Sequence, residues 1–188
     1  MTESAAARKA AAKPTVVGEG RVVRIGDRLI LRLPEQASRQ LPSRGQVAVQ
    51  ALVNGHAFDA VLEPDGAQGH WLPLGEELRR EAGVEEGTTA GFEFRPAGAW
   101  PEPQVPADLR EALDDAADLA GTWEDITPMA RWEWVRWVGA TKNPQTRQRR
   151  VEVSISKLRS GKRRPCCFNL ASCTDPELSK NGKLLGIE

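Results

Sequence analysis

The residues best suited to chemistry lie in a basic stretch near the C-terminus. Residues 136–164 contain ten arginines and lysines against one acidic residue, Glu152. Guanidinium groups bind carboxylates and phosphates through paired hydrogen bonds, and amides in a first helical turn favour anions. We therefore predict an anion- or partner-binding surface made of Lys142, Thr146, Arg147, Arg149, Arg150, Arg163, Arg164 and Trp132. The alternative is that these arginines pair with the acidic segment 108–118.

Three tryptophans fall within one predicted helix of about 13 residues, and their spacing separates them. Trp134 shares a face with Val135 and Val138, whereas Trp132 lies on the other side. A helix that is apolar on two faces is either buried between other elements or presents one face to a partner. Trp132 is the tryptophan that would meet such a partner.

Two adjacent cysteines, Cys166 and Cys167, follow three positive charges, and nearby positive charge favours the reactive thiolate. They are either possible reactive thiols or small apolar residues that dock the tail. Their spacing matches no pair of zinc ligands, so we predict no metal site. His56 and His70 are expected in turns or at the surface.

The remaining composition argues for a binding protein more than for an enzyme. No Ser/His/Asp set, phosphate-cradling glycine loop or paired carboxylates can be identified, and we predict no cofactor. The 188 residues have zero net charge, but the charge is segregated: +5, −6, −7 and +8 over residues 1–50, 51–100, 101–135 and 136–188. We expect the partner to be a protein or an anionic molecule, and nucleic acid is an alternative partner. The oligomeric state is not determined.

The elements that position these residues form two halves. A disordered tail is expected at 1–14. Residues 15–96 are predicted to form the order strand, strand, short helix, strand, and this order occurs twice with nearly the same spacing between elements. Such units close each other into a small pseudo-twofold, double-split β-barrel, which removes the exposed sheet edges. Asn54-Gly55 predicts a two-residue hairpin turn within it.

A Pro-rich linker at 97–106 precedes a predicted three-helix module at 107–168 and a polar tail at 169–188. The helices are expected over 108–120, 128–140 and 144–160, with Thr127-Pro128 and Asn143-Pro144 as start signals. The fold class is therefore α+β. No run of apolar residues is long enough to span a membrane, and no secretory signal is visible, so a cytoplasmic location is expected.

The segment 137–150 (WVGATKNPQTRQRR) and the following 157–165 (KLRSGKRRP) resemble the YdeI/OmpD-associated, or bacteriocin-protection, family. The barrel half, with 54–58 (NGHAF), is similar to a domain of unknown function, family 1905, and more distantly to double-split barrels of AbrB-type regulators. The first resemblance implies tolerance to antimicrobial peptides or envelope stress, without a reaction. A nucleic-acid-binding regulator and a thiol-dependent redox sensor or enzyme are the alternatives.

Overall fold

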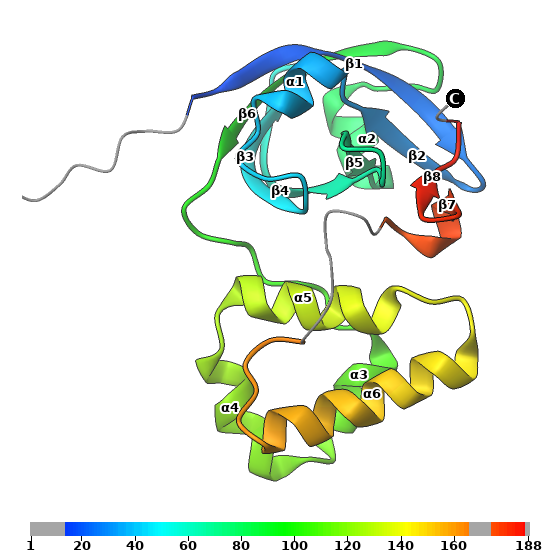
Figure 1. Cartoon of the computed structure of the whole chain (residues 1–188). Coiled ribbons are helices and arrows are strands. Elements are labelled where there is room, and N and C mark those ends of the chain that lie inside the picture. The colour runs from blue at the N-terminus through cyan, green and yellow to red at the C-terminus, as the bar shows by residue number, and fades with distance from the viewer. Residues whose placement is uncertain (1–13, 166–173, 187–188) are drawn as a thin grey trace, which may run out of the picture.

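The computed structural model describes residues 14–165 and 174–186. A closed antiparallel barrel forms one half, and a group of helices packs beneath it in Figure 1. The α+β prediction is confirmed. Residues 1–13 of the predicted tail and the cysteines at 166, 167 and 173 lie outside the described residues.

Six strands close the barrel in the order β1-β2-β5-β4-β3-β6, with β6 pairing back onto β1. Alternation along the chain sets which side chains face inward. In β6, for example, Ala90, Phe92 and Phe94 are buried, while Glu93 and Arg95 are exposed. The strands are β1 (Val16–Ile25), β2 (Arg28–Arg32), β3 (Val47–Val53), β4 (His56–Pro64), β5 (His70–Leu74) and β6 (Thr89–Pro96).

The strand order explains the predicted pseudo-twofold repeat. Exchanging β1, β2 and β3 with β4, β5 and β6 leaves every neighbouring pair unchanged. Short helices follow the second strand of each unit, α1 (Glu35–Arg39) after β2 and α2 (Glu76–Ala82) after β5. Each unit by itself would leave unpaired edges, and the two units together remove them.

The predicted hairpin turn joins β3 to β4. Asn54 and Gly55 have φ of 46° and 86°, and Val53 pairs with His56 across them. Positive φ at both central residues defines the turn type that matches the twist of a hairpin, and Asn-Gly adopts it at low cost. Local sequence therefore sets the register of these two strands.

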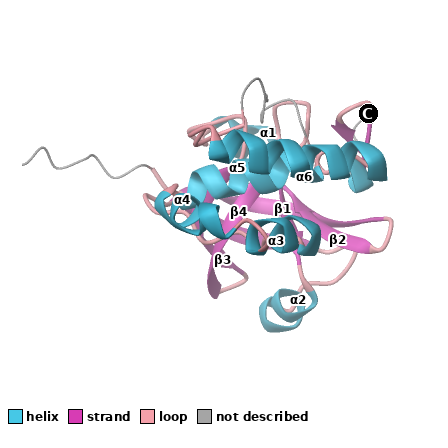
Figure 2. Ribbon diagram, turned by 90° about the horizontal axis from the view of Figure 1, so that it is seen from below, coloured by secondary structure: helices cyan, strands magenta, loops and turns pink. Residues whose placement is uncertain are grey.

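Within its described residues, up to 165, the helical module contains four α-helices where the sequence predicts three. They are α3 (Ala107–Asp114), α4 (Ala120–Asp125), α5 (Pro128–Gly139) and α6 (Pro144–Arg159), with a short 3-10 helix, η1 (Ala117–Leu119), before α4. Figure 2 shows these helices lying across one side of the barrel. The starts of α5 and α6 are as predicted, because Thr127 and Asn143 accept hydrogen bonds from the amides of Ala130 and Thr146.

The predicted helix over 108–120 is divided. Ala116 has φ of −100° and ψ of 64°, outside the helical region, and Gly121 lies inside α4 instead of ending a helix. The break brings Ala116, Leu119 and Ile126 against Trp134 in one buried cluster. Tertiary packing thus overrides a continuous helical pattern.

The C-terminal segment, residues 174–186, packs against the barrel, although the sequence suggests only a polar tail. A 3-10 helix, η3 (Pro176–Leu178), leads into the small hairpin β7 (Ser179–Lys180) and β8 (Lys183–Leu184) beside β2 (Figure 1). Leu178 and Leu184 pack with Ile25, Ile30 and Trp71. A second Asn-Gly pair at 181–182, with positive φ at both residues, is the missed sequence signal.

No helix among the described residues combines the length and apolar character needed to cross a bilayer.

Candidate functional site: the cleft between barrel and helices

Most of the predicted basic residues already have partners inside the helical module. Arg147 donates through Nε and Nη2 to the Asp108 carboxylate, at 2.6 and 3.0 Å. This contact holds the pKa of Asp108 below its usual range. Arg163 is paired with Asp125 at 2.6 Å, and Arg164 pairs with the buried Glu133. Pairing with the acidic segment 108–118 is seen for Arg147, and for Arg159 with Asp118, whereas Asp125 and Glu133 lie outside that segment.

The other predicted residues lie on the surface of α6 or beside it. Lys142 and Arg149 are exposed, and Arg149 lies 3.5 Å from Glu152. Arg150 donates to the backbone carbonyl of Trp137 and lies over its ring, 5.6 Å from the ring centroid. The amide of Thr146 is occupied by the Asn143 cap at 2.9 Å, so it is not a free donor for an anion.

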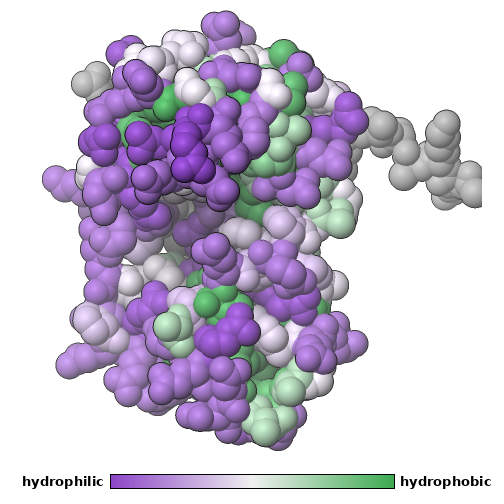
Figure 3. Space-filling model, turned by 180° about the vertical axis from the view of Figure 1, so that it is seen from behind, coloured by the Kyte–Doolittle hydropathy of each residue, from purple (hydrophilic) through white to green (hydrophobic). Residues whose placement is uncertain are grey.

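A cleft of about 340 Å³ lies where the barrel, the helical module and the C-terminal segment meet. The space-filling view shows the surface hollowed between the two halves and mostly hydrophilic (Figure 3). Of the predicted site residues, Arg147 and Trp132 line this cleft. Its lining also includes Arg28, Gln46, Gln104, Arg136, Thr141, Asp175 and Glu177.

Three guanidinium groups reach the cleft from three separate elements. Arg28 comes from β2, Arg136 from α5 and Arg147 from α6. Each is paired with a carboxylate: Arg28 with Asp175, Arg136 with Glu63 and Arg147 with Asp108. A guanidinium has five N–H donors, more than one carboxylate engages, so the carboxylate partners among the described residues do not use all the donors of these arginines.

The pair of Arg136 and Glu63 joins the helical module to the barrel. Both side chains are largely buried, with 12% and 8% exposed. Burial raises the pKa of Glu63, and the charge of Arg136 together with hydrogen bonds from Gln46 opposes that rise. Gln46 Nε2 lies 3.1 and 3.2 Å from the two carboxylate oxygens, while its own amide oxygen is buried without a partner among the described residues.

Trp132 forms an aromatic wall of the cleft. It is half-buried, its Nε1 donates to the carbonyl of Pro101 at 2.7 Å, and its ring lies 6.4 Å from that of Trp100. Contacts with the Pro-rich linker therefore hold the Trp132 ring in position. Trp134, two residues away, is fully buried in the core of the module. The same helix thus carries a core tryptophan and a cleft tryptophan.

The expectation that both histidines lie in turns or at the surface is wrong for His70. Its side chain is buried, with Nε2 donating to the carbonyl of Gly45 at 3.0 Å. The first three residues of β5, His70, Trp71 and Leu72, are all buried, and Ser38 Oγ also accepts the backbone amide of His70. His56, next to the hairpin turn, is partly exposed and contacts Glu81 at 2.9 Å.

Burial of His70 predicts a loss of stability in mild acid. Desolvation lowers the pKa of His70 below its usual 6.5, so the unfolded chain binds a proton that the folded chain does not. The free energy of unfolding should therefore fall as pH drops below about 6.5. Replacing His70 by Gln should flatten this part of the profile. Urea unfolding between pH 5 and pH 7.5 measures it, and equal slopes for both proteins would contradict the prediction.

Sequence reasoning did not select Arg28, Gln46, Glu63 or Asp175 for the site. Arg28 and Glu63 occur within strands, where a charged side chain is ordinarily predicted to face solvent. No signal in the sequence marks Glu63, because the four consecutive buried positions at the end of β4, residues 61–64, are visible only in the structure. A carboxylate in such a run needs a buried partner.

Comparison with known proteins agrees with this two-part architecture of a barrel followed by a helical module. The barrel, over residues 19–93, matches a domain of unknown function, DUF1905. The helices, over residues 102–161, match the family described as bacteriocin-protection, YdeI or OmpD-associated. Both predicted resemblances are confirmed, and the family description associates the helical module with protection against bacteriocins. No curated protein matches the chain.

Proposed function

We propose that the protein is a non-enzymatic binding protein of the stress-protection type, and that it holds an anionic group of its partner in the cleft. The basic helical surface leads into this site. Arg147 and Trp132 line the cleft itself, and Lys142, Arg149 and Arg150 supply positive charge around α6. The description of the helical family supports the protective role.

The observation that carries the proposal is the meeting of Arg28, Arg136 and Arg147 in one cleft of ligand size. A volume near 340 Å³ is at the small end of the range of cofactor and small-molecule pockets. Arginine forks suit carboxylates and phosphates, and an aromatic wall adds contact area at low entropic cost. The arrangement therefore suits a compact anionic group with an apolar or planar part.

Two arginines of α6 allow a matched test of this proposal. Arg147 and Arg159 each donate through Nε and Nη2 to an aspartate, Asp108 and Asp118 respectively. Only Arg147 lines the cleft. We expect Arg147→Gln to weaken the binding of citrate by about tenfold, the loss of one charge-assisted hydrogen bond, whereas Arg159→Gln leaves affinity unchanged.

Isothermal titration calorimetry with citrate and with inorganic phosphate measures this effect. Equal affinities for the two variants, or no binding by the wild-type protein, would reject the cleft as the site. Binding to duplex DNA that falls steeply with salt would favour the nucleic-acid regulator instead. The protective role is tested separately, by survival of cells producing the wild-type or the Arg147→Gln chain during exposure to a cationic antimicrobial peptide.

A further inference from the structure

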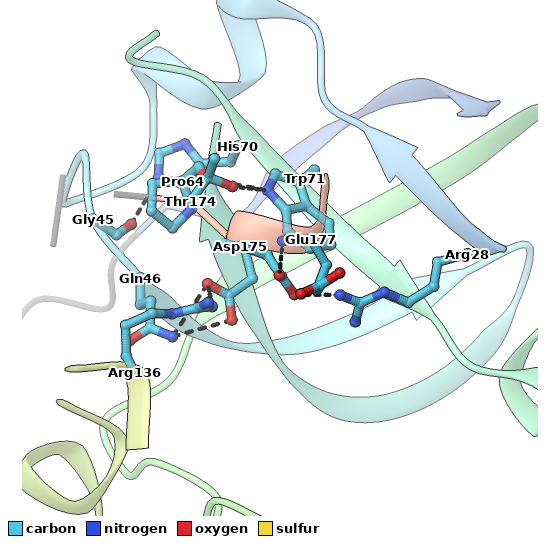
Figure 4. A network of polar contacts seen from close by, with 11 residues as sticks. Arg28, Gly45, Gln46, Pro64, His70, Trp71, Arg136, Thr174, Asp175 and Glu177 are labelled. Carbon is cyan, nitrogen blue, oxygen red and sulfur yellow. Dashed lines mark hydrogen bonds and ion pairs between the residues drawn. The ribbon is translucent and has the colours of Figure 1, made fainter. Parts of the chain in front are cut away.

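The C-terminal segment brings acidic groups to the wall of the cleft. Asp175 pairs with Arg28, and Asp175, Pro176 and Glu177 all line the cleft. Figure 4 shows Asp175 and Arg28 facing each other below Trp71. The Asp175 side chain is 18% exposed, and that of Arg28 is 44% exposed. The mostly buried Asp175 carboxylate is therefore paired with Arg28, whose side chain is more accessible to solvent.

The segment is anchored to the barrel independently of this ion pair. Leu178 and Leu184 are buried, and the Leu184 amide donates to the carbonyl of Asp65 at 2.9 Å. Thr174 Oγ1 accepts from Trp71 Nε1 at 3.1 Å, and Arg32 donates to the carbonyl of Gly186 at 2.7 Å. The Asp175–Arg28 ion pair adds to these anchors, so the segment should open more often when that pair is broken.

We infer that the C-terminal segment is a built-in competitor for the cleft, whose Asp175 carboxylate holds the arginine that a ligand would engage. This inference rests on the proposed function and names its regulation. The internal occupant is an aspartate side chain, so the competing ligand is a carboxylate-bearing molecule. An entering carboxylate meets the negative charges of Asp175 and Glu177, and it must share or take over the donors of Arg28.

Competition of this kind acts equally in both directions. If Asp175 opposes the ligand, then removing its charge raises the affinity by some factor. By linkage, the ligand weakens the contact of the segment with Arg28 by the same factor. The segment should therefore open more often when the ligand is bound. The amides of Leu184 and Leu185, which donate to Asp65 and Leu178, report that opening.

Asp175→Asn is the informative variant because it removes the charge and keeps the local turn. Asp175 Oδ1 accepts the amide of Glu177 at 2.9 Å, and an asparagine oxygen can replace it. The matched control is Asp125→Asn, which removes the partner of Arg163, because neither residue lines the cleft. We expect Asp175→Asn to bind citrate roughly 5-fold more tightly or better, and Asp125→Asn to bind as the wild-type protein does.

Calorimetry and hydrogen exchange on the full chain decide the outcome. Citrate should speed exchange at Leu184 and Leu185 in the wild-type protein and have little effect in Asp175→Asn. Equal citrate affinity in the two proteins would overturn the competitor while leaving the binding function in place. Weaker binding by Asp175→Asn would also overturn it, because Asp175 would then be a ligand contact. Absence of binding by both proteins would overturn the binding function as well.

Discussion

Replacing Arg136 by Met is expected to lower the free energy of unfolding at neutral pH by about 3–5 kcal/mol, the usual cost of stranding one member of a buried ion pair. Arg136 is the positive partner of Glu63 between the two halves of the protein. Without it, the Glu63 carboxylate keeps hydrogen bonds from Gln46 but loses its opposing charge. Chemical denaturation followed by tryptophan fluorescence measures the loss.

The same variant should recover stability in acid. Burial already raises the pKa of Glu63, and removing Arg136 raises it further. The folded state then keeps a proton that the unfolded chain has released. Stability therefore falls as pH rises through the interval between the unfolded and folded pKa values, and the deficit is smallest near pH 4.

A double variant separates the charge effect from a loss of packing. Adding Glu63→Gln to Arg136→Met removes the stranded carboxylate while keeping its shape, so part of the lost stability should return at neutral pH. A cost that is the same at pH 4 and pH 7, and that the second substitution does not reduce, would show that Arg136 acts through packing alone. In that case the charge interaction between Arg136 and Glu63 would not stabilise the contact between the barrel and the helical module.

Trp134→Ala is expected to lower the free energy of unfolding of the helical module by about 3–5 kcal/mol, the range for removing a buried aromatic side chain. Trp134 is fully buried among Leu119, Ile126 and Leu158. Its Nε1 also donates to the carbonyl of Arg163 at 3.2 Å. Removing the ring leaves a cavity in a small core that has little means of collapsing around it. Circular dichroism during thermal unfolding measures the change.

Trp132→Ala is the matched comparison, two residues earlier on the same helix. Its ring is half-buried against Trp100 and the Pro101 carbonyl, so we expect a smaller loss of about 1–2 kcal/mol. Binding of citrate should weaken in Trp132→Ala, because Trp132 lines the cleft. The reverse pattern, a larger stability loss at Trp132 than at Trp134, would contradict the division between core and cleft tryptophans.

The barrel could be predicted from sequence because its determinants are local and repeated. Alternating apolar residues, the Asn54-Gly55 turn and the two similar strand-helix-strand spacings each specify structure within a few residues. Closure then follows from the need to pair every edge. The starts of α5 and α6 could also be predicted from the sequence, because a helix cap depends on residues only three positions apart.

The candidate site could be predicted only in part. The sequence indicated Arg147 and Trp132 through residue type, but it could not distinguish arginines with internal partners from those that face a cleft. Arg163 lies 38 positions from its partner Asp125, and Arg147 lies 39 positions from Asp108. Such pairings depend on how α3, α4, α5 and α6 pack. They leave no periodic trace in either segment.

The sequence by itself determined the α+β class, the closed pseudo-twofold barrel and the basic character of the helical module, since these follow from local pattern and composition. Tertiary structure alone decided that Glu63 pairs with Arg136, that the C-terminal segment lines the cleft and that His70 is buried. The physical reason is that a side chain's partner and burial depend on elements distant in the chain. Elements that pack together bring such residues into contact whatever their separation in sequence.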